Sequence, residues 1–239
     1  ECPGHFAHID LAKPVYHIGF LSKVKKILEC VCFHCSKLKV DDSDPRFVHA
    51  RKIRDAKARM RAVWELAKVK TVCDGGSGDD NGFEETDEQQ RNPHGGCGNK
   101  QPLIRKDGLK LYAVFRASAN DDSGHEGRTQ LPAHKVLQIL KNISDQDIRD
   151  MGLSEEFARP EWMIITILPV PPPQVRPSIQ MDGTARGEDD LTHKLSDVLK
   201  ANANVRRCES EGAPVHVVQE FEQLLQFHIA TYMDNDIAG

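Results

Sequence analysis

Apolar residues recur along the chain in two patterns, one typical of amphipathic helices and one typical of strands. Spacings of three and four residues predict helices, each with one apolar face, over residues 22–29, 132–143, 144–152, 188–202 and 212–234. Ser22 and Ser144 are the predicted N-caps of the first and third of these helices. Alternation of apolar and polar residues predicts a strand over 15–20 and a hairpin over 101–115 with Asp107-Gly108 at its turn. The apolar run 161–170 predicts a buried strand. Mixed helices and short antiparallel strands define an α+β fold.

The net charge of -4 conceals two segments of opposite charge. Residues 46–70 carry nine Lys or Arg against two acidic residues, and Asp44 and Pro45 are typical of a helix N-cap and first turn. The pattern predicts one long amphipathic helix whose basic face is either simply solvated or attracted to phosphates. Residues 74–96 carry seven acidic residues against Arg91, and their many glycines predict a mobile loop.

The seven cysteines point to metal ligation in a reducing compartment, because an odd number at short spacings does not suit a disulfide framework. Cys32 and Cys35 have the C-x-x-C spacing that offers two ligands from one turn. Cys73 and Cys97 adjoin glycines that let the backbone curl around a metal, and they complete a predicted tetrahedral zinc site. Four buried cysteines acting as small apolar side chains are the alternative.

Cys2 and His5 have C-x-x-H spacing and offer half of a second zinc site. The chain begins without Met or a signal peptide, so we expect an internal fragment whose two further ligands would precede Glu1. Cys30 and Cys208 are expected to be buried small side chains. No apolar run approaches the ~20 residues that cross a membrane, so we expect a soluble protein with no membrane partner.

Six stretches of sequence carry a resemblance that covers the whole chain. They read CPGHFAHIDLAKPVYHIGF, CFHC, GGCGNKQPLIRKDGLKL, RPEWMIITILPVPPPQVRPS, RGEDDLTHKL and LLQFHIATYMDNDIAG. In this order they resemble the N-terminal region of the largest subunit of eukaryotic DNA-directed RNA polymerase II. The resemblance implies the clamp, a mobile zinc-bearing module that closes over DNA and the RNA–DNA hybrid in the nucleus. Its zinc ligands correspond to Cys32, Cys35, Cys73 and Cys97, and those of its second site to Cys2 and His5.

The resemblance also implies partners and cofactors. The partners are the DNA template, the nascent RNA and the other polymerase II subunits, and the zinc is structural. Mg²⁺ belongs to the full nucleotidyltransferase, because the family's catalytic loop N-A-D-F-D-G-D is absent from this sequence. We therefore expect the chain alone to be inactive. A free-standing zinc-stabilised nucleic-acid-binding module is the alternative, and a thiol enzyme using Cys30 or Cys32 with His34 is another. Asp234 and Asp236 are typical of a turn.

Five of the thirteen prolines lie between Pro169 and Pro177. They predict a stiff extended stem that carries the following loop roughly 15 Å from the core. The loop mixes apolar and cationic side chains, which suits contact with stacked bases and phosphates. The resemblance implies that it is the lid, which parts the transcript from the template. The residues expected to contact nucleic acid are Val175, Arg176, Ser178, Ile179 and Arg186.

These patterns and the resemblance together divide the chain into four parts. The first is a zinc-binding clamp part over 1–116, which includes the acidic loop 74–96. The second, over 117–168, begins with a polar linker at 117–130 and continues with clamp helices and the buried strand. The third is a lid-like loop over 169–190, and the fourth is a helical hairpin of the clamp base over 191–239.

Overall fold

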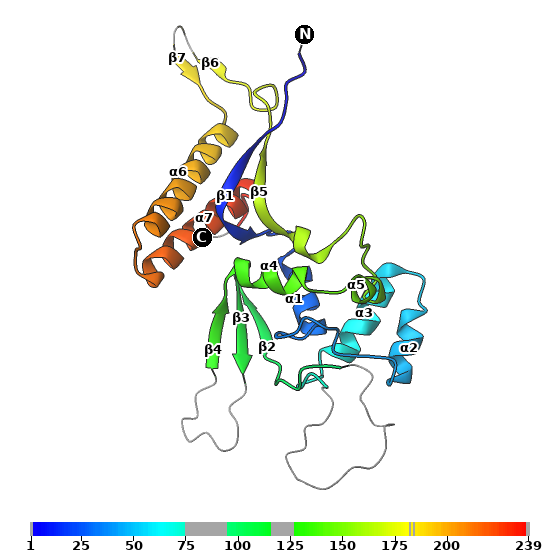
Figure 1. Cartoon of the computed structure of the whole chain (residues 1–239). Helices are drawn as coiled ribbons and strands as arrows, with labels where there is room; N and C mark the ends of the chain where they lie inside the picture. The colour runs from blue at the N-terminus through cyan, green and yellow to red at the C-terminus, as the bar shows by residue number, and fades with distance from the viewer. Residues whose placement is uncertain (1, 75–94, 116–126, 182, 184, 238–239) are drawn as a thin grey trace, which may run out of the picture. The chain divides into compact units, whose positions relative to one another are not determined.

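The computed structural model describes residues 2–74, 95–115, 127–181, 183 and 185–237 (Figure 1), so nearly all of the predicted acidic loop lies outside the described residues. The chain forms two compact units. Unit 1 combines Glu1–Gly19 with Ile164–Gly239, and unit 2 is Phe20–Met163. The first residues of the chain thus fold with the last ones. The four-part division by function stays a prediction.

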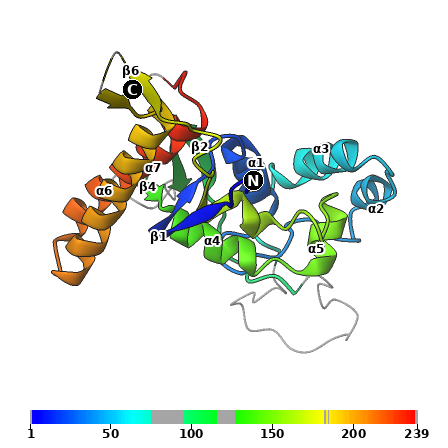
Figure 2. The ribbon, with the colours of Figure 1, turned by 90° about the horizontal axis from the view of Figure 1, so that it is seen from above.

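Unit 1 is a two-stranded antiparallel sheet packed against a helical hairpin. Strand β1 (Ala7–Tyr16) pairs with β5 (Ile164–Val170), and helices α6 (Asp190–Ser210) and α7 (Val215–Met233) lie side by side in Figures 1 and 2. Apolar residues of all four elements form one core, which comprises Ile9, Val15, Ile165, Leu168, Leu195, Val198, Ala201, Val205, Leu225 and Ile229. The predicted helices of this unit are confirmed. The strand predicted over 161–170 is present as β5, but it begins at Ile164 and is not buried throughout, since Ile167 is 53% exposed.

Two amide side chains from the helices bind the backbone of β1, which is irregular where its pairing with β5 shifts register. Asn202 of α6 donates to the Asp10 carbonyl (2.9 Å) and accepts from the Ala12 N–H (2.7 Å). Gln226 of α7 donates to the Tyr16 carbonyl (2.8 Å) and accepts from its N–H (2.6 Å). Each amide binds both a carbonyl and an N–H group of β1, and so the two amides fix β1 on the helical hairpin.

Unit 2 consists of a three-stranded antiparallel sheet and several short helices. The sheet has the order β2-β3-β4, with β2 at Leu103–Asp107, β3 at Lys110–Phe115 and β4 at Gly127–Leu131. The helices are α1 (Leu21–Cys30), α2 (Pro45–Arg51), α3 (Ala56–Ala67), α4 (Ala133–Lys141), α5 (Asp145–Asp150) and the 3-10 helix η1 (Pro160–Met163). Its most buried side chains include Leu21, Ile27, Leu111, Leu140 and Ile148. The predicted hairpin over 101–115 and the helices α4 and α5 are confirmed, but the two turn residues are Gly108 and Leu109, one position after the predicted Asp107-Gly108.

The single long basic helix predicted after Asp44 is wrong, because the segment forms two helices, α2 and α3. Asp44 caps α2 as predicted, accepting from the Arg46 N–H at 2.9 Å. Asp55 then caps α3, accepting from the Ala58 N–H at 2.7 Å. An acidic N-cap offers the backbone a new helix start, and here it outweighs the continuous helical periodicity of the apolar residues.

Three further boundaries differ from the predictions. The strand predicted over 15–20 ends at Tyr16, and α1 begins after Phe20 with no side-chain cap, so Ser22 is not its N-cap. The predicted polar linker contains β4, which pairs with β3. Four of the five residues of β4 are exposed, so its side chains carry little strand signal and only backbone pairing defines it.

Candidate functional site

The loop after α1 places two thiols on the same side of a tight turn. The Cys32 N–H donates to the Lys37 carbonyl at 2.7 Å, and the Ser36 N–H donates to the Cys32 carbonyl at 3.0 Å. Ser36 has a φ of 62°, a left-handed conformation that closes the turn. The N–H groups of His34 (3.3 Å) and Cys35 (3.4 Å) point at the Cys32 sulfur. His34 itself is exposed, and the cysteine side chains face inward.

The other two thiols come from two segments that pair by their backbones. Val72 and Lys100 form an isolated antiparallel bridge. The Cys73 N–H donates to the Asn99 carbonyl, and the Gly98 N–H donates to the Cys73 carbonyl, both at 3.0 Å. This pairing brings Cys73 and Cys97 together although more than twenty residues separate them.

A glycine is required where these segments approach most closely. A Cβ atom on Gly96 would lie 2.5 Å from the Asp74 carbonyl oxygen and 2.8 Å from the Cys73 sulfur. Both distances are too short for real contacts, and the first involves backbone that cannot rotate away. The glycine next to the fourth cysteine therefore lets the chain pass directly over the site.

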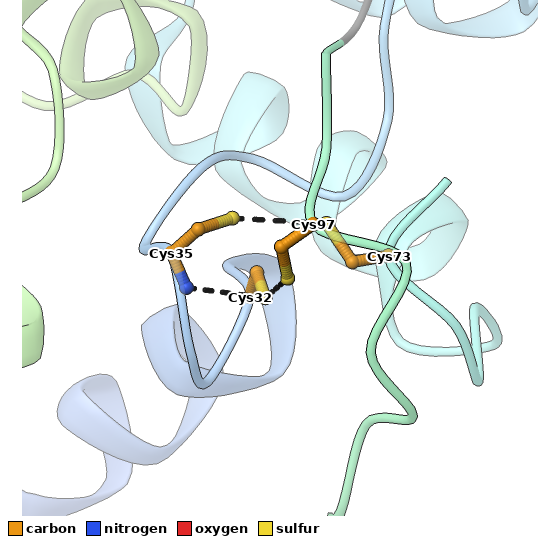
Figure 3. Close-up of side chains that lie close together, drawn as sticks. All are labelled: Cys32, Cys35, Cys73 and Cys97. Carbon is orange, nitrogen blue, oxygen red and sulfur yellow. Dashed lines mark hydrogen bonds between the residues drawn. The ribbon is translucent and has the colours of Figure 1, made fainter. Parts of the chain in front are cut away.

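The four sulfur atoms form a compact cluster. Sγ of Cys32 lies 3.5 Å from Sγ of Cys97, Sγ of Cys35 lies 3.8 Å from Sγ of Cys73, and all four lie within 4.8 Å of one another (Figure 3). Disulfide bonds are about 2.05 Å long, so these thiols are free. A tetrahedral zinc with Zn–S bonds of about 2.3 Å places its sulfur ligands about 3.8 Å apart. The cluster fits that geometry, with four protein ligands.

Polar side chains support the sulfur atoms from outside the cluster. Asn99 donates from Nδ2 to Sγ of Cys97, and Gln101 donates from Nε2 to Sγ of Cys32, each at 3.2 Å. Gln101 also accepts from the Phe33 N–H at 2.8 Å, which fixes its orientation. Hydrogen bonds to sulfur stabilise thiolates and orient ligands. The sequence patterns do not single out these two residues, whose only signal is their place just after the fourth cysteine.

The thiols of the cluster differ in acidity. Burial raises the pKa of Cys35 and of Cys73. Burial also acts to raise the pKa of Cys97, but hydrogen bonds from the Asn99 backbone and side chain and from Cys32 and Cys35 lower it to about 7. A metal ligated by thiolates displaces these protons, so metal affinity rises with pH.

A buried lysine lies beside the cluster. The Lys39 side chain is buried, and its Nζ donates to the Lys70 carbonyl at 3.3 Å. Burial lowers the pKa of Lys39, and the negative charges of nearby groups, among them Cys32 and Cys73, act to raise it. Four thiolates around a dication carry a net charge of −2, and a nearby ammonium partly offsets it.

The thiol-enzyme alternative finds no support in the structure. Cys30 is fully buried in α1, and burial raises its pKa to about 12, so it is a poor nucleophile at neutral pH. Cys208 is buried in α6. Cys32 belongs to the four-sulfur cluster, and the His34 ring is not among the ligand atoms that gather there.

The second predicted site comprises only a pair of ligands in the described part of the chain. Sγ of Cys2 lies 3.6 Å from Nε2 of His5, and both side chains are exposed. Among the described residues, no group of three or more metal-ligating side chains includes this pair. The pair has ligand spacing, and its role as a zinc site stays a prediction.

The proline-rich segment forms a turn and a hairpin instead of the predicted extended stem and loop. The Val175 N–H donates to the Pro172 carbonyl (3.0 Å), so Pro173 occupies the second turn position, which its fixed φ suits. Strands β6 (Ile179–Met181) and β7 (Ala185–Gly187) then pair antiparallel. The stem prediction is therefore wrong after Pro172, because proline favours turns as well as extended chain.

The residues predicted to contact nucleic acid differ in exposure. Val175 and Ile179 are 61% and 66% exposed, Arg186 is exposed on β7, and Ser178 is half-buried. Arg176 instead lies at the base of the hairpin, where it donates to the Pro171 carbonyl (3.0 Å) and to Oγ1 of Thr192 (3.1 Å). It anchors the hairpin to the start of α6.

The fold and site define a two-unit α+β protein with a four-cysteine candidate metal centre. Among the described helices, none is long and apolar enough to span a membrane. The family model of RNA polymerase Rpb1, domain 1, matches residues 1–239, and the chain therefore belongs to this family. It is an N-terminal part of the largest subunit of a multisubunit DNA-directed RNA polymerase, a nucleotidyltransferase whose partners are other subunits and nucleic acid. The match gives the alternative of a free-standing module no support.

Proposed function

We propose that this chain is the clamp of nuclear RNA polymerase II, which closes over the DNA and the RNA–DNA hybrid. The observation that carries the proposal is the convergence of Cys32, Cys35, Cys73 and Cys97 within a chain of the Rpb1 family. The sequence resemblance to polymerase II over the whole chain supports the finer assignment. The exposed hairpin formed by β6 and β7 supports a contact with nucleic acid.

The metal in this proposal is a structural zinc. Four cysteine ligands fill a tetrahedral coordination sphere and leave no position for substrate, which is typical of structural sites. When bound, zinc joins the Cys32–Cys35 loop to the segments around Cys73 and Cys97. It thereby holds together parts of unit 2 whose backbones share only a few hydrogen bonds.

The hairpin Ile179–Gly187 is the proposed lid. Exposed Ile179 offers an apolar surface for a stacked base, and exposed Arg186 offers a cation for a phosphate. The Arg176 anchor holds the hairpin in one position relative to α6. A wedge that is held in place can separate RNA from template at the upstream end of the hybrid.

Replacing Ile179–Gly187 with a Gly-Ser segment of equal length in the assembled polymerase tests this role. We expect the RNA–DNA hybrid to extend upstream, because the wedge is gone, while zinc content and folding stay unchanged. Nuclease mapping of stalled complexes measures the hybrid end. A matched control, Val215→Ser, alters an exposed apolar residue of the same unit and should leave the hybrid unchanged. An unchanged hybrid end in the Gly-Ser variant would refute the strand-parting role.

A further inference from the structure

The outer edge of β2 in unit 2 has backbone groups available for pairing. The turn Gly108-Leu109 has two residues, so its closing pair, Asp107 and Lys110, exchanges both backbone hydrogen bonds. Because bonded and non-bonded pairs alternate, the N–H and C=O groups of Ile104 and Lys106 point away from β3. In the described part of the chain, these groups have no hydrogen-bond partner beyond the sheet.

A cleft of about 370 Å³ lies between this edge and α1. It is lined by Lys25, Glu29 and Leu103–Lys106. Ser22, Lys25 and Glu29 follow one face of α1, at positions i, i+3 and i+7. Nζ of Lys106 approaches Oγ of Ser22 at 3.5 Å, which confirms that this face of α1 is turned toward β2. The volume falls within the range of ligand-binding clefts, roughly 300–1,000 Å³.

The cleft carries an excess of positive charge. Lys25, Arg105 and Lys106 line it against a single carboxylate, that of Glu29. Glu29 is already engaged, since it pairs with Nζ of Lys25 at 3.0 Å and accepts from Nε1 of Trp64 at 2.7 Å. Arg105 and Lys106 have no ion-pair partner among the described residues. Two cations therefore remain for a ligand.

We propose that this cleft binds an extended acidic peptide segment of a partner protein, which adds as a strand to β2. The outward groups of Ile104 and Lys106 are alternately donors and acceptors, which match the backbone of another strand. Arg105 and Lys106 then select acidic side chains by charge. Nucleic acid fits less well, because its phosphates only accept hydrogen bonds and would repel Glu29 and the β2 carbonyls that point away from β3. The proposal concerns a protein partner and is independent of the clamp assignment.

Fluorescence anisotropy of labelled peptides with the chain tests the proposal. We expect the peptide (Val-Glu)4 to bind and to weaken with salt, while (Val-Lys)4 and an rU12 oligonucleotide bind more weakly. Lys106→Pro removes an N–H that points away from β3, so it blocks strand addition and leaves the sheet paired. We expect this variant to lose roughly tenfold in affinity, the effect of about one hydrogen bond.

A charge variant and a control test the selection of acidic side chains separately from the addition of a strand to β2. Arg105→Glu with Lys106→Glu reverses the charge without altering the edge backbone, and it should abolish binding of (Val-Glu)4. Lys141→Glu, at the exposed end of α4, makes a charge change elsewhere and should have little effect. Tighter binding of rU12 than of (Val-Glu)4, no binding at millimolar peptide, or full affinity in both cleft variants would each overturn the proposal.

Discussion

Replacing Cys73 with serine is expected to release the metal and unfold the segments that meet at the four-cysteine centre. Structural zinc contributes roughly 10 to 16 kcal/mol in small domains, and a serine hydroxyl does not replace a thiolate ligand. Among the described residues, the Cys32–Cys35 loop has no backbone hydrogen bond to the segment around Cys73, so the metal is its main tie to that segment. Elemental analysis should therefore find the zinc lost, and amide exchange in residues 32–39 and 71–74 should become fast.

The matched control for this substitution is Cys208→Ser, which changes a buried cysteine of α6 outside the cluster. This variant should keep its zinc and its normal amide exchange in unit 2, because the substitution only places a polar hydroxyl in the core of unit 1. A Cys73→Ser protein with full zinc content and slow exchange around the site would show that the cluster does not depend on its third cysteine.

Replacing Asn202 with leucine is expected to destabilise β1 by about 2 kcal/mol, because a part-buried backbone N–H is left without its acceptor. The Ala12 N–H loses its acceptor, whereas the Asp10 carbonyl keeps a donor in Arg206 (2.7 Å). Amide exchange of β1 through local opening should then accelerate roughly 30-fold.

Asn204→Leu serves as the control on the same helix, since Asn204 is half-buried and makes no hydrogen bond to another described side chain or strand. It should leave the exchange of β1 nearly unchanged. Equal acceleration in both variants would mean that leucine disturbs α6 in general and that the amide contact with β1 carries no special stability.

Local signals in the sequence predicted the local elements well. The caps Asp44 and Ser144 and the hairpin turn at Gly108 each act within a few residues, so short patterns find the caps and place the turn to within one position. The four cysteines were also predictable, because C-x-x-C spacing and adjacent glycines are themselves local requirements of a metal loop. Local patterns failed at Asp55, where a second cap competed with helical periodicity.

Local patterns do not predict which distant segments of the chain pair with each other. The pairing of β1 with β5 joins residues about 150 positions apart, and no periodicity in either segment specifies its partner. Asn202 and Gln226 lie within helical stretches where a polar residue predicts a solvent-facing position. Their role follows from the backbone of β1 lying beside them, which is a property of the assembled unit. Gln101 was missed for the same reason, since its contact with Sγ of Cys32 joins residues 69 positions apart. Asn99 was missed although its contact with Sγ of Cys97 is local, two residues away.

The four-cysteine zinc centre is tested most directly by X-ray absorption at the zinc edge, combined with a zinc count. The measurement is made on a Cys2→Ser, His5→Ala variant, which removes the second candidate site. We predict one zinc per chain with four sulfur neighbours at about 2.3 Å. A first shell that contains nitrogen or oxygen, or a folded chain that binds no zinc, would contradict the centre formed by Cys32, Cys35, Cys73 and Cys97.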